Sequence, residues 1–189
     1  MRLKNKVAVV TGGARDIGRA VSCQLAREGA KVVINYFDSE EHAQETLSLI
    51  QSEGGEGIIV QGDMTKAADA NTLVEKTKEA YGEEIHILVN VAGGLVARKR
   101  LVEMDEEFWD FVVNLNFKSV FLVSKAVVPF MPAGSSIVNF SSLAARDGGG
   151  PGASVYASAK GAVMTYTRSL AKELGPQGIR VNALAPGVI

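Results

Sequence analysis

Short apolar runs alternate along this chain with longer stretches in which apolar residues recur at helical spacing. Continuous apolar runs of about 4–8 residues, bounded by polar or turn residues, are typical of strands that are buried on both faces. The runs predict strands at 7–10, 31–36, 57–60, 85–89, 136–140 and 179–184. The stretches between them predict helices at about 18–28, 39–52, 67–81 and 105–130, and a last helix that follows the glycine-rich segment 148–152 and ends near Gly175.

Strands that alternate with helices must pair in parallel, because each connection is a long crossover. The expected fold is an α/β doubly wound sheet of the Rossmann type, with strand order 3-2-1-4-5-6 and helices on both faces. We expect a single domain over 1–189, since no repeat, linker or low-complexity segment divides the chain. The ligand crevice of such a sheet lies at the carboxyl ends of its strands.

Composition and charge narrow the classes of partner. The chain is 47% hydrophobic and 22% charged, and its formal net charge is −1, so neither nucleic acid nor an anionic membrane surface is expected to bind it. The first apolar run is too short for a signal sequence or a membrane span. The single cysteine, Cys23, excludes an internal disulfide, and we expect a buried thiol and a cytoplasmic protein. We expect no metal site.

Tyr156 and Lys160 are four residues apart, so on a helix they lie on one face. A free tyrosine titrates near pH ~10, and a neighbouring ammonium stabilises the phenolate. The two side chains could therefore act together in proton transfer. By itself the spacing more often describes a packed ring and a solvated amine, so the assignment depends on the rest of the chain.

Gly12 and Gly18 lie in the turn that follows the first predicted strand and opens the next helix. Glycine at such a turn lets the backbone approach a pyrophosphate, whose charge then meets the helix N-terminus. An ordinary tight turn would use the same residues, so this pattern alone is weak.

Six motifs stand in a fixed order along the chain. They are Thr11-Gly12 with Gly18, Asn90-x-Ala92-Gly93, Asn116, Ser142, Tyr156-x-x-x-Lys160 and Pro186-Gly187. In this order the whole chain resembles the short-chain dehydrogenase/reductase family, and most of all its 3-oxoacyl-carrier-protein reductases and related carbonyl reductases. The resemblance implies an NAD(P)-dependent oxidoreductase that acts on a small carbonyl compound or secondary alcohol. Family members continue past the position of Ile189, so we expect C-terminal elements to be missing.

The resemblance implies four catalytic residues. Tyr156 would exchange a proton with the substrate oxygen, and Lys160 would hold the nicotinamide ribose and assist Tyr156. Ser142 would hydrogen-bond the substrate oxygen, and Asn116 would position a water that relays protons to Lys160. Ser142 could instead bond its own backbone, and Asn116 could be a satisfied polar residue in an apolar helix.

The resemblance also implies a set of cofactor-binding residues. They are Thr11, Gly12, Arg15, Ile17, Gly18, Tyr36, Asp63, Met64, Asn90, Ala92, Gly93, Tyr156, Lys160, Pro186, Gly187 and Ile189. The family places an aspartate against adenine at the position of Asp63, although a loop cap is equally expected there. The second strand ends without a carboxylate before Asp38, and Arg15 lies in the glycine turn. An acidic residue at that strand end would bond the ribose 2′-hydroxyl, so we expect NADP rather than NAD unless Asp38 folds back.

The chain departs from the family pattern at several positions. Asp16 replaces a glycine of the turn, and a carboxylate ~4 Å from a phosphate would repel it by roughly 4 kcal/mol at intermediate dielectric. We therefore expect its side chain to point away, paired with a base or capping the helix. His86 stands where an aspartate is usual, and Val91 replaces an asparagine. The spacing from Ser142 to Tyr156 is one residue longer than usual, which the glycine-rich segment can absorb.

Two further interpretations concern function and assembly. A weakly catalytic dinucleotide-binding sensor or scaffold is the alternative function, and the complete catalytic set argues against it. The predicted helix at 105–130 is apolar on more than one face, with Val120 and Phe121 as candidate contacts. In the family this helix and the helix of Tyr156 pair with their copies, and Val163, Met164 and Tyr166 are the outward apolar candidates of the second helix. We therefore expect a homodimer or homotetramer.

Overall fold

The structure, a computed structural model, describes residues 1–187 and confirms the alternation of strands and helices. The strands are β1 (Val7–Thr11), β2 (Lys31–Tyr36), β3 (Glu56–Gln61), β4 (Ile87–Asn90), β5 (Ser136–Phe140) and β6 (Arg180–Leu184). The α-helices are α1 (Asp16–Arg27), α2 (Glu40–Ser52), α3 (Ala67–Tyr81), α4 (Glu106–Val113), α5 (Ser119–Val127), α6 (Ala144–Asp147) and α7 (Ser154–Leu174). Short helical turns are η1 (Leu101–Glu103), η2 (Asn114–Lys118), η3 (Val128–Phe130) and η4 (Gly175–Gln177).

The six strands form one parallel sheet in the order β3-β2-β1-β4-β5-β6, as predicted. β1 is a central strand, and each of its five residues is buried. Val9 lies opposite Val33 of β2 on one side and Leu88 of β4 on the other. Because successive side chains of a strand point to opposite faces, the sheet needs an apolar layer on both sides.

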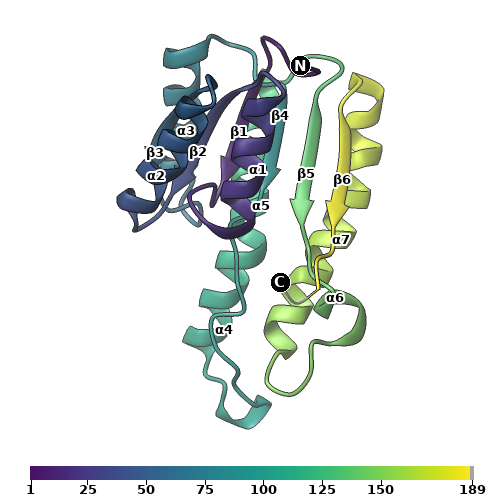
Figure 1. Cartoon of the computed structure of the whole chain (residues 1–189). Helices are drawn as coiled ribbons and strands as arrows, with labels where there is room; N and C mark the ends of the chain where they lie inside the picture. The colour runs from purple at the N-terminus through teal and green to yellow at the C-terminus, as the bar shows by residue number, and fades with distance from the viewer. Residues whose placement is uncertain (188–189) are drawn as a thin grey trace.

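Helices cover both faces of the sheet and give it two hydrophobic cores (Figure 1). On one face, α1 and α2 pack on β1 and β2 through Ala26, Leu47 and Ile50. Cys23 of α1 is a buried free thiol near this core, as expected for a core residue. On the other face, α3, α5 and α7 pack through residues such as Leu73 of α3. Because the six strands are parallel, their carboxyl ends lie at the same edge of the sheet, and α4 and α6 extend beyond this edge (Figure 1).

Three local features differ from the sequence prediction. β4 begins at Ile87 rather than Ile85, because the Ile85 N–H donates to Phe130 O at 2.9 Å, outside the sheet ladder. β6 begins one residue late, because the Ile179 N–H bonds Leu174 O in the preceding turn at 3.3 Å. The short helix α6 was not predicted, since four residues carry too little periodicity to indicate a helix.

The predicted helix at 105–130 is one continuous helical stretch, Glu106–Phe130, but it is not regular. A single π-helical turn, η2, separates α4 from α5 and contains Asn116. The Asn116 side-chain amide donates to Val112 O at 3.0 Å within this stretch. π-turns insert one residue into a helix and are frequent at functional sites.

This helical stretch is long and apolar enough to cross a membrane by length and composition. Core packing accounts for one of its faces, since Val112, Val120, Val123 and Val127 are each at most 1% exposed. Val120 is therefore a core residue rather than a candidate for contact with a partner.

His86 lies next to the start of β1. Its Nδ1 accepts a hydrogen bond from the Val7 N–H at 3.2 Å, which requires that nitrogen to be unprotonated. Burial, and then the charge of Lys6, lower the pKa of His86 from its usual 6.5, whereas Glu84 opposes the shift. The neutral imidazole therefore belongs to the folded state.

We expect His86 to make the protein less stable in mild acid. As the pH falls below 6.5, the unfolded chain binds a proton at His86 that the folded chain binds only at lower pH, so the free energy of unfolding decreases. Urea titrations between pH 7.5 and 5 should show a steeper loss in the unmodified protein than in His86→Asn, whose side-chain oxygen can still accept from Val7. Equal slopes for the two proteins would contradict this role.

Candidate active site

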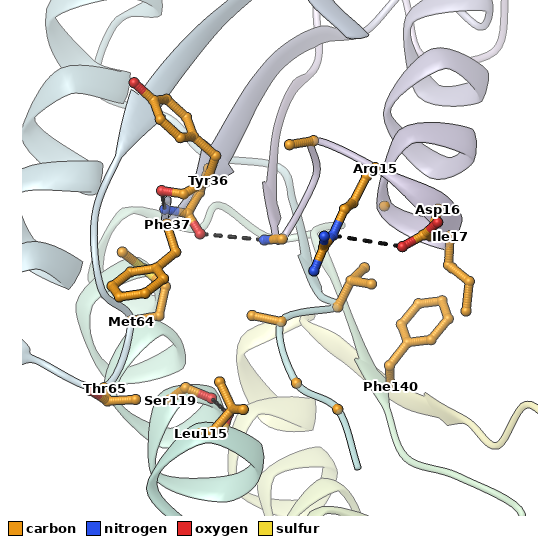
Figure 2. A pocket seen from close by; sticks show the side chains of 18 of the residues that line it. Arg15, Asp16, Ile17, Tyr36, Phe37, Met64, Thr65, Leu115, Ser119 and Phe140 are labelled. Atoms are coloured by element: carbon orange, nitrogen blue, oxygen red, sulfur yellow. Dashed lines mark hydrogen bonds and ion pairs between the residues drawn. The ribbon is translucent and has the colours of Figure 1, made fainter. Parts of the chain in front are cut away.

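A cavity of about 810 Å³ lies at the carboxyl ends of the strands. It is lined by the turn after β1, the end of β2 and the loops after β3, β4 and β5, together with residues of α4, α5 and α7. Figure 2 shows this cavity from close by, with the glycine turn, the end of β2, and Leu115, Ser119 and Phe140 around it. This is where a doubly wound sheet is expected to bind its ligand.

The glycine turn is shaped by close backbone contacts. A Cβ atom on Gly18 would collide with Gly12 O, so only glycine allows α1 to start this close to β1. Gly12 has a φ of +61°, and a Cβ atom there would lie 3.1 Å from the Ala92 backbone. Both glycines are thus required by the packing of the turn. The arrangement leaves the N-terminus of α1 open to the cavity, where Arg15, Asp16 and the partly exposed Ile17 line the wall.

Asn35 connects three strand ends around the cavity, which sequence reasoning missed. Its side-chain oxygen accepts from the Gly12 N–H at 3.3 Å, and its amide donates to Gly62 O at 3.1 Å and Val60 O at 3.3 Å. Asn35 O also accepts from the Gly13 N–H at 2.9 Å. A buried polar residue at the end of an otherwise apolar strand was the available signal, since such a group costs stability unless it is bonded.

Lys160 is buried, with 3% of its surface exposed, yet it lines the cavity. Its ammonium donates to Phe140 O at 2.8 Å. Burial lowers the pKa of Lys160 to about 8 from its usual 10.5. A lysine ammonium has three donors, so this side chain keeps hydrogen-bonding capacity toward the cavity.

Tyr156 and Ser142 line the same cavity as Lys160. The Lys160 ammonium is 6.0 Å from the centre of the Tyr156 ring, as one helical turn of α7 dictates. The Ser142 hydroxyl oxygen accepts from the Ala144 N–H at 3.2 Å, so the backbone bond considered for this serine is present. A hydroxyl that accepts through its oxygen still has its own proton to donate, and Ser142 can therefore still donate to a ligand.

Asn116 and Lys160 meet at Gly93. A Cβ atom on Gly93 would lie 2.7 Å from Asn116 Oδ1 and 2.9 Å from Lys160 Nζ. The Asn116 side chain exchanges two hydrogen bonds of 2.9 Å with the backbone of Gly94 and is fully buried. Asn116 is therefore a satisfied polar residue that fixes the loop after β4 next to Lys160. Its expected role in a water relay stays a prediction.

Most of the predicted cofactor-binding residues line the cavity. Those that do are Gly12, Arg15, Ile17, Gly18, Tyr36, Asp63, Met64, Ala92, Gly93, Tyr156, Lys160, Pro186 and Gly187. Thr11 lies behind the wall, where its hydroxyl accepts from the Ala92 N–H at 3.2 Å. Ile189 lies outside the described residues. The structure also adds residues that were not predicted, among them Phe37, Ser39, Phe111, Leu115 and Ser119.

Asn90 also lies behind the cavity wall rather than on it. Its amide donates to Asn139 Oδ1 at 2.9 Å, and the Asn139 amide donates to the Thr167 hydroxyl at 2.9 Å. This buried chain of bonds ties β4, β5 and α7 together. Asn90 is 2% exposed and is not among the residues that line the cavity, and its expected contact with a cofactor stays a prediction.

Asp63 forms the loop cap that sequence reasoning considered as likely as an adenine contact. Its carboxylate accepts from the Thr65 N–H at 3.0 Å and from the Thr65 hydroxyl at 2.7 Å. Burial opposes ionisation of Asp63, but these bonds and the Lys66 ammonium outweigh it and lower its pKa. Asp63 is therefore a charged loop cap that also borders the cavity.

The residues that line the cavity fit a dinucleotide. A glycine cradle opens into the cavity at the N-terminus of α1, and the buried ammonium of Lys160 lines the same cavity. Within residues 1–187, no group of three His, Cys, Asp or Glu side chains is placed to hold a metal ion.

Comparison with known proteins agrees with this geometry. The family model described as "short chain dehydrogenase" matches residues 6–189. A 3-oxoacyl-[acyl-carrier-protein] reductase of Synechocystis sp. is 40% identical in an alignment of 189 positions, which covers 99% of this chain and 75% of that protein. The chain spans between 64% and 75% of the length of the curated relatives it matches, and 65% of two of them.

Two solved structures bear on the cofactor. A short-chain dehydrogenase of Burkholderia cenocepacia in complex with NADP is 36% identical, with a TM-score of 0.94 over 99% of this chain and 76% of that chain. The NADH-dependent reductase A1-R′ complexed with NAD is 35% identical, with a TM-score of 0.94 over 98% of this chain and 79% of that chain. With its fold, its glycine turn and its Ser142, Tyr156 and Lys160 cavity, this chain belongs to the short-chain dehydrogenase/reductase family.

Proposed function

We propose that this protein is an NAD(P)-dependent oxidoreductase that acts on a carbonyl compound or a secondary alcohol. The observation that carries the proposal is the meeting of Ser142, Tyr156 and Lys160 in the cavity that the glycine turn opens. A nucleotide sensor would need the turn but not three side chains arranged for proton transfer, so the sensor alternative is disfavoured.

Each side chain has a task that its surroundings allow. Nicotinamide supplies or accepts the hydride when bound. The Tyr156 hydroxyl gives its proton to the substrate oxygen during reduction, because a carbonyl that gains a hydride must also gain a proton. Ser142 donates a hydrogen bond to the same oxygen as charge develops on it. Burial lowers the pKa of Lys160 to about 8, so its ammonium still carries most of its charge at neutral pH and can donate hydrogen bonds to a ligand in the cavity.

For the substrate, we propose a ketone of the 3-oxoacyl type, with reduction as the working direction. The support is the similarity to the Synechocystis reductase, together with a relative named as a probable tetrahydroxynaphthalene reductase, which is 36% identical. Both names describe reductases, which supports reduction as the working direction.

For the cofactor, we propose NADP. Arg15 lines the cavity, and β2 ends in Asn35 and Tyr36 rather than in a carboxylate. Asp38 also lines the cavity and is exposed, so it is the group that would favour NAD.

We also propose that the protein forms at least a homodimer through the outer face of α4 and α5. Trp109 and Phe121 are 49% and 42% exposed on this stretch, whereas its inner face is buried in the core. Of the candidates on α7, Val163 is fully buried and cannot reach a partner, and Met164 and Tyr166 are partly buried. A two-fold contact between copies would cover the exposed rings.

Replacing Tyr156 by Phe should abolish reduction of simple 3-oxo compounds, with a loss of about 100-fold or more, because the phenol proton is gone. Binding of NADPH, followed by nicotinamide fluorescence, should stay within about threefold. Tyr166→Phe makes the same change on the same helix, outside the cavity, and should retain turnover. Turnover of Tyr156→Phe close to that of the unmodified chain would refute the role.

Replacing Lys160 by Met should lower both turnover and NADPH affinity, while Lys172→Met, on the exposed part of α7, changes neither. The folded-state pKa of Lys160 is about 8, below the usual 10.5, so the folded chain loses this proton at lower pH than the unfolded chain. The unmodified protein should therefore gain stability relative to Lys160→Met as pH rises from 8 to 10.5. Denaturation curves with a pH-independent difference would rule out a buried ammonium.

Replacing Phe121 by Asp should split the oligomer, because each two-fold contact would bury the new charge twice. Light scattering at micromolar concentration measures the mass of each variant. Leu49→Asp, at a side chain of similar exposure (45%) on α2, should leave the oligomer intact. A monomeric unmodified protein would show that the outer face of α4 and α5 has no partner copy.

A further inference from the structure

Arg15 and Asp16 form an ion pair inside the proposed nucleotide cavity. Arg15 Nε lies 3.7 Å from Asp16 Oδ2, and the two side chains are 66% and 85% exposed. Both residues line the cavity. In Figure 2 this pair lies across the cavity from Tyr36 and Phe37, the residues at the end of β2. The predicted pairing of Asp16 with a nearby base is therefore present, and the base is the one proposed to bind a 2′-phosphate.

The backbone holds Asp16 in this place. Asp16 is the first residue of α1, where a carboxylate is stabilised by the positive end of the helix. Its φ is +49°, a left-handed conformation that glycine adopts freely and that Asp and Asn tolerate better than other residues. The residue thus keeps the turn conformation of the glycine it replaces, and adds a negative charge that glycine would not have.

This charge affects the two cofactors unequally. NADPH differs from NADH by the 2′-phosphate, which needs a cation to offset its charge. Among the described residues, one arginine and one lysine line the cavity, Arg15 and Lys160. Arg15 is the one that lies in the glycine turn. To bind the 2′-phosphate, the Arg15 guanidinium must either break its ion pair with Asp16 or bind the carboxylate and the phosphate at the same time.

We propose that Asp16 is a specificity-determining residue that limits the preference for NADPH by competing with the 2′-phosphate for Arg15. This inference rests on the proposed function, since it concerns the cofactor of the same site. It differs from simple repulsion of phosphate by Asp16, which would weaken NADPH and NADH alike through their common pyrophosphate.

The test is a double-mutant cycle on nucleotide binding. NADPH and NADH are titrated by nicotinamide fluorescence into the unmodified chain, Asp16→Asn, Arg15→Ala and the double variant. Asn keeps the shape of Asp and its tolerance for positive φ, so the turn is preserved. We expect Asp16→Asn to tighten NADPH about threefold to fivefold, the scale of an exposed ion pair, with a change of less than about twofold for NADH. In the Arg15→Ala background, Asp16→Asn should no longer favour NADPH over NADH.

Two controls keep the result interpretable. Glu107→Gln removes the same charge from the exposed surface of α4, outside the cavity, and should leave both affinities unchanged. Thermal unfolding checks that each variant is folded. An equal gain for both nucleotides, or a NADPH gain that persists without Arg15, would overturn the competition. Failure of the unmodified chain to bind either nucleotide would instead refute the proposed function.

Discussion

The burial of one ammonium group at the end of the sheet is the constraint on which the site depends. Lys160 is held between the end of β5 and the loop after β4, and its ammonium bonds Phe140 O. The Ser141 hydroxyl donates to Lys160 O at 2.7 Å, so the same helical turn is fixed to β5 at two points. Because an ammonium that is removed from water needs hydrogen-bond acceptors, backbone carbonyl groups have to lie close to it. The position of Tyr156, one turn earlier on α7, follows from these contacts.

Buried amides extend this constraint along the strand ends. Asn35 ties the glycine turn to β2 and β3, Asn90 and Asn139 tie β4 to β5 and α7, and Asn116 ties α4 and α5 to the loop after β4. The amides of Asn35, Asn116 and Asn139 both donate and accept, and that of Asn90 donates, so together they join strand ends that carry no side-chain charge. The carboxyl edge of the sheet is therefore rigid where a ligand would lie, which preorganises the reacting groups.

The glycine turn shows how one substitution can keep a fold and change its electrostatics. The contact between Gly18 and Gly12 O leaves no room for a side chain, whereas the position of Asp16 faces the cavity and has space for one. The backbone therefore accepts a carboxylate at a left-handed position with little change in shape. The charge of Asp16 acts on Arg15 and on any anion that binds in the cavity, rather than on the packing of α1.

The sequence by itself determined the fold class, the strand order, the glycine turn and the helical spacing of Tyr156 and Lys160. These features depend on periodicity and turn chemistry between near neighbours, which the order of residues records directly. Only the tertiary structure decided that Val163 and Val120 are core and that Asn35 ties the glycine turn to the end of β3. The same is true of the π-turn at Asn116. Such outcomes depend on which side chains the packed sheet and helices bring together, and no local pattern contains that information.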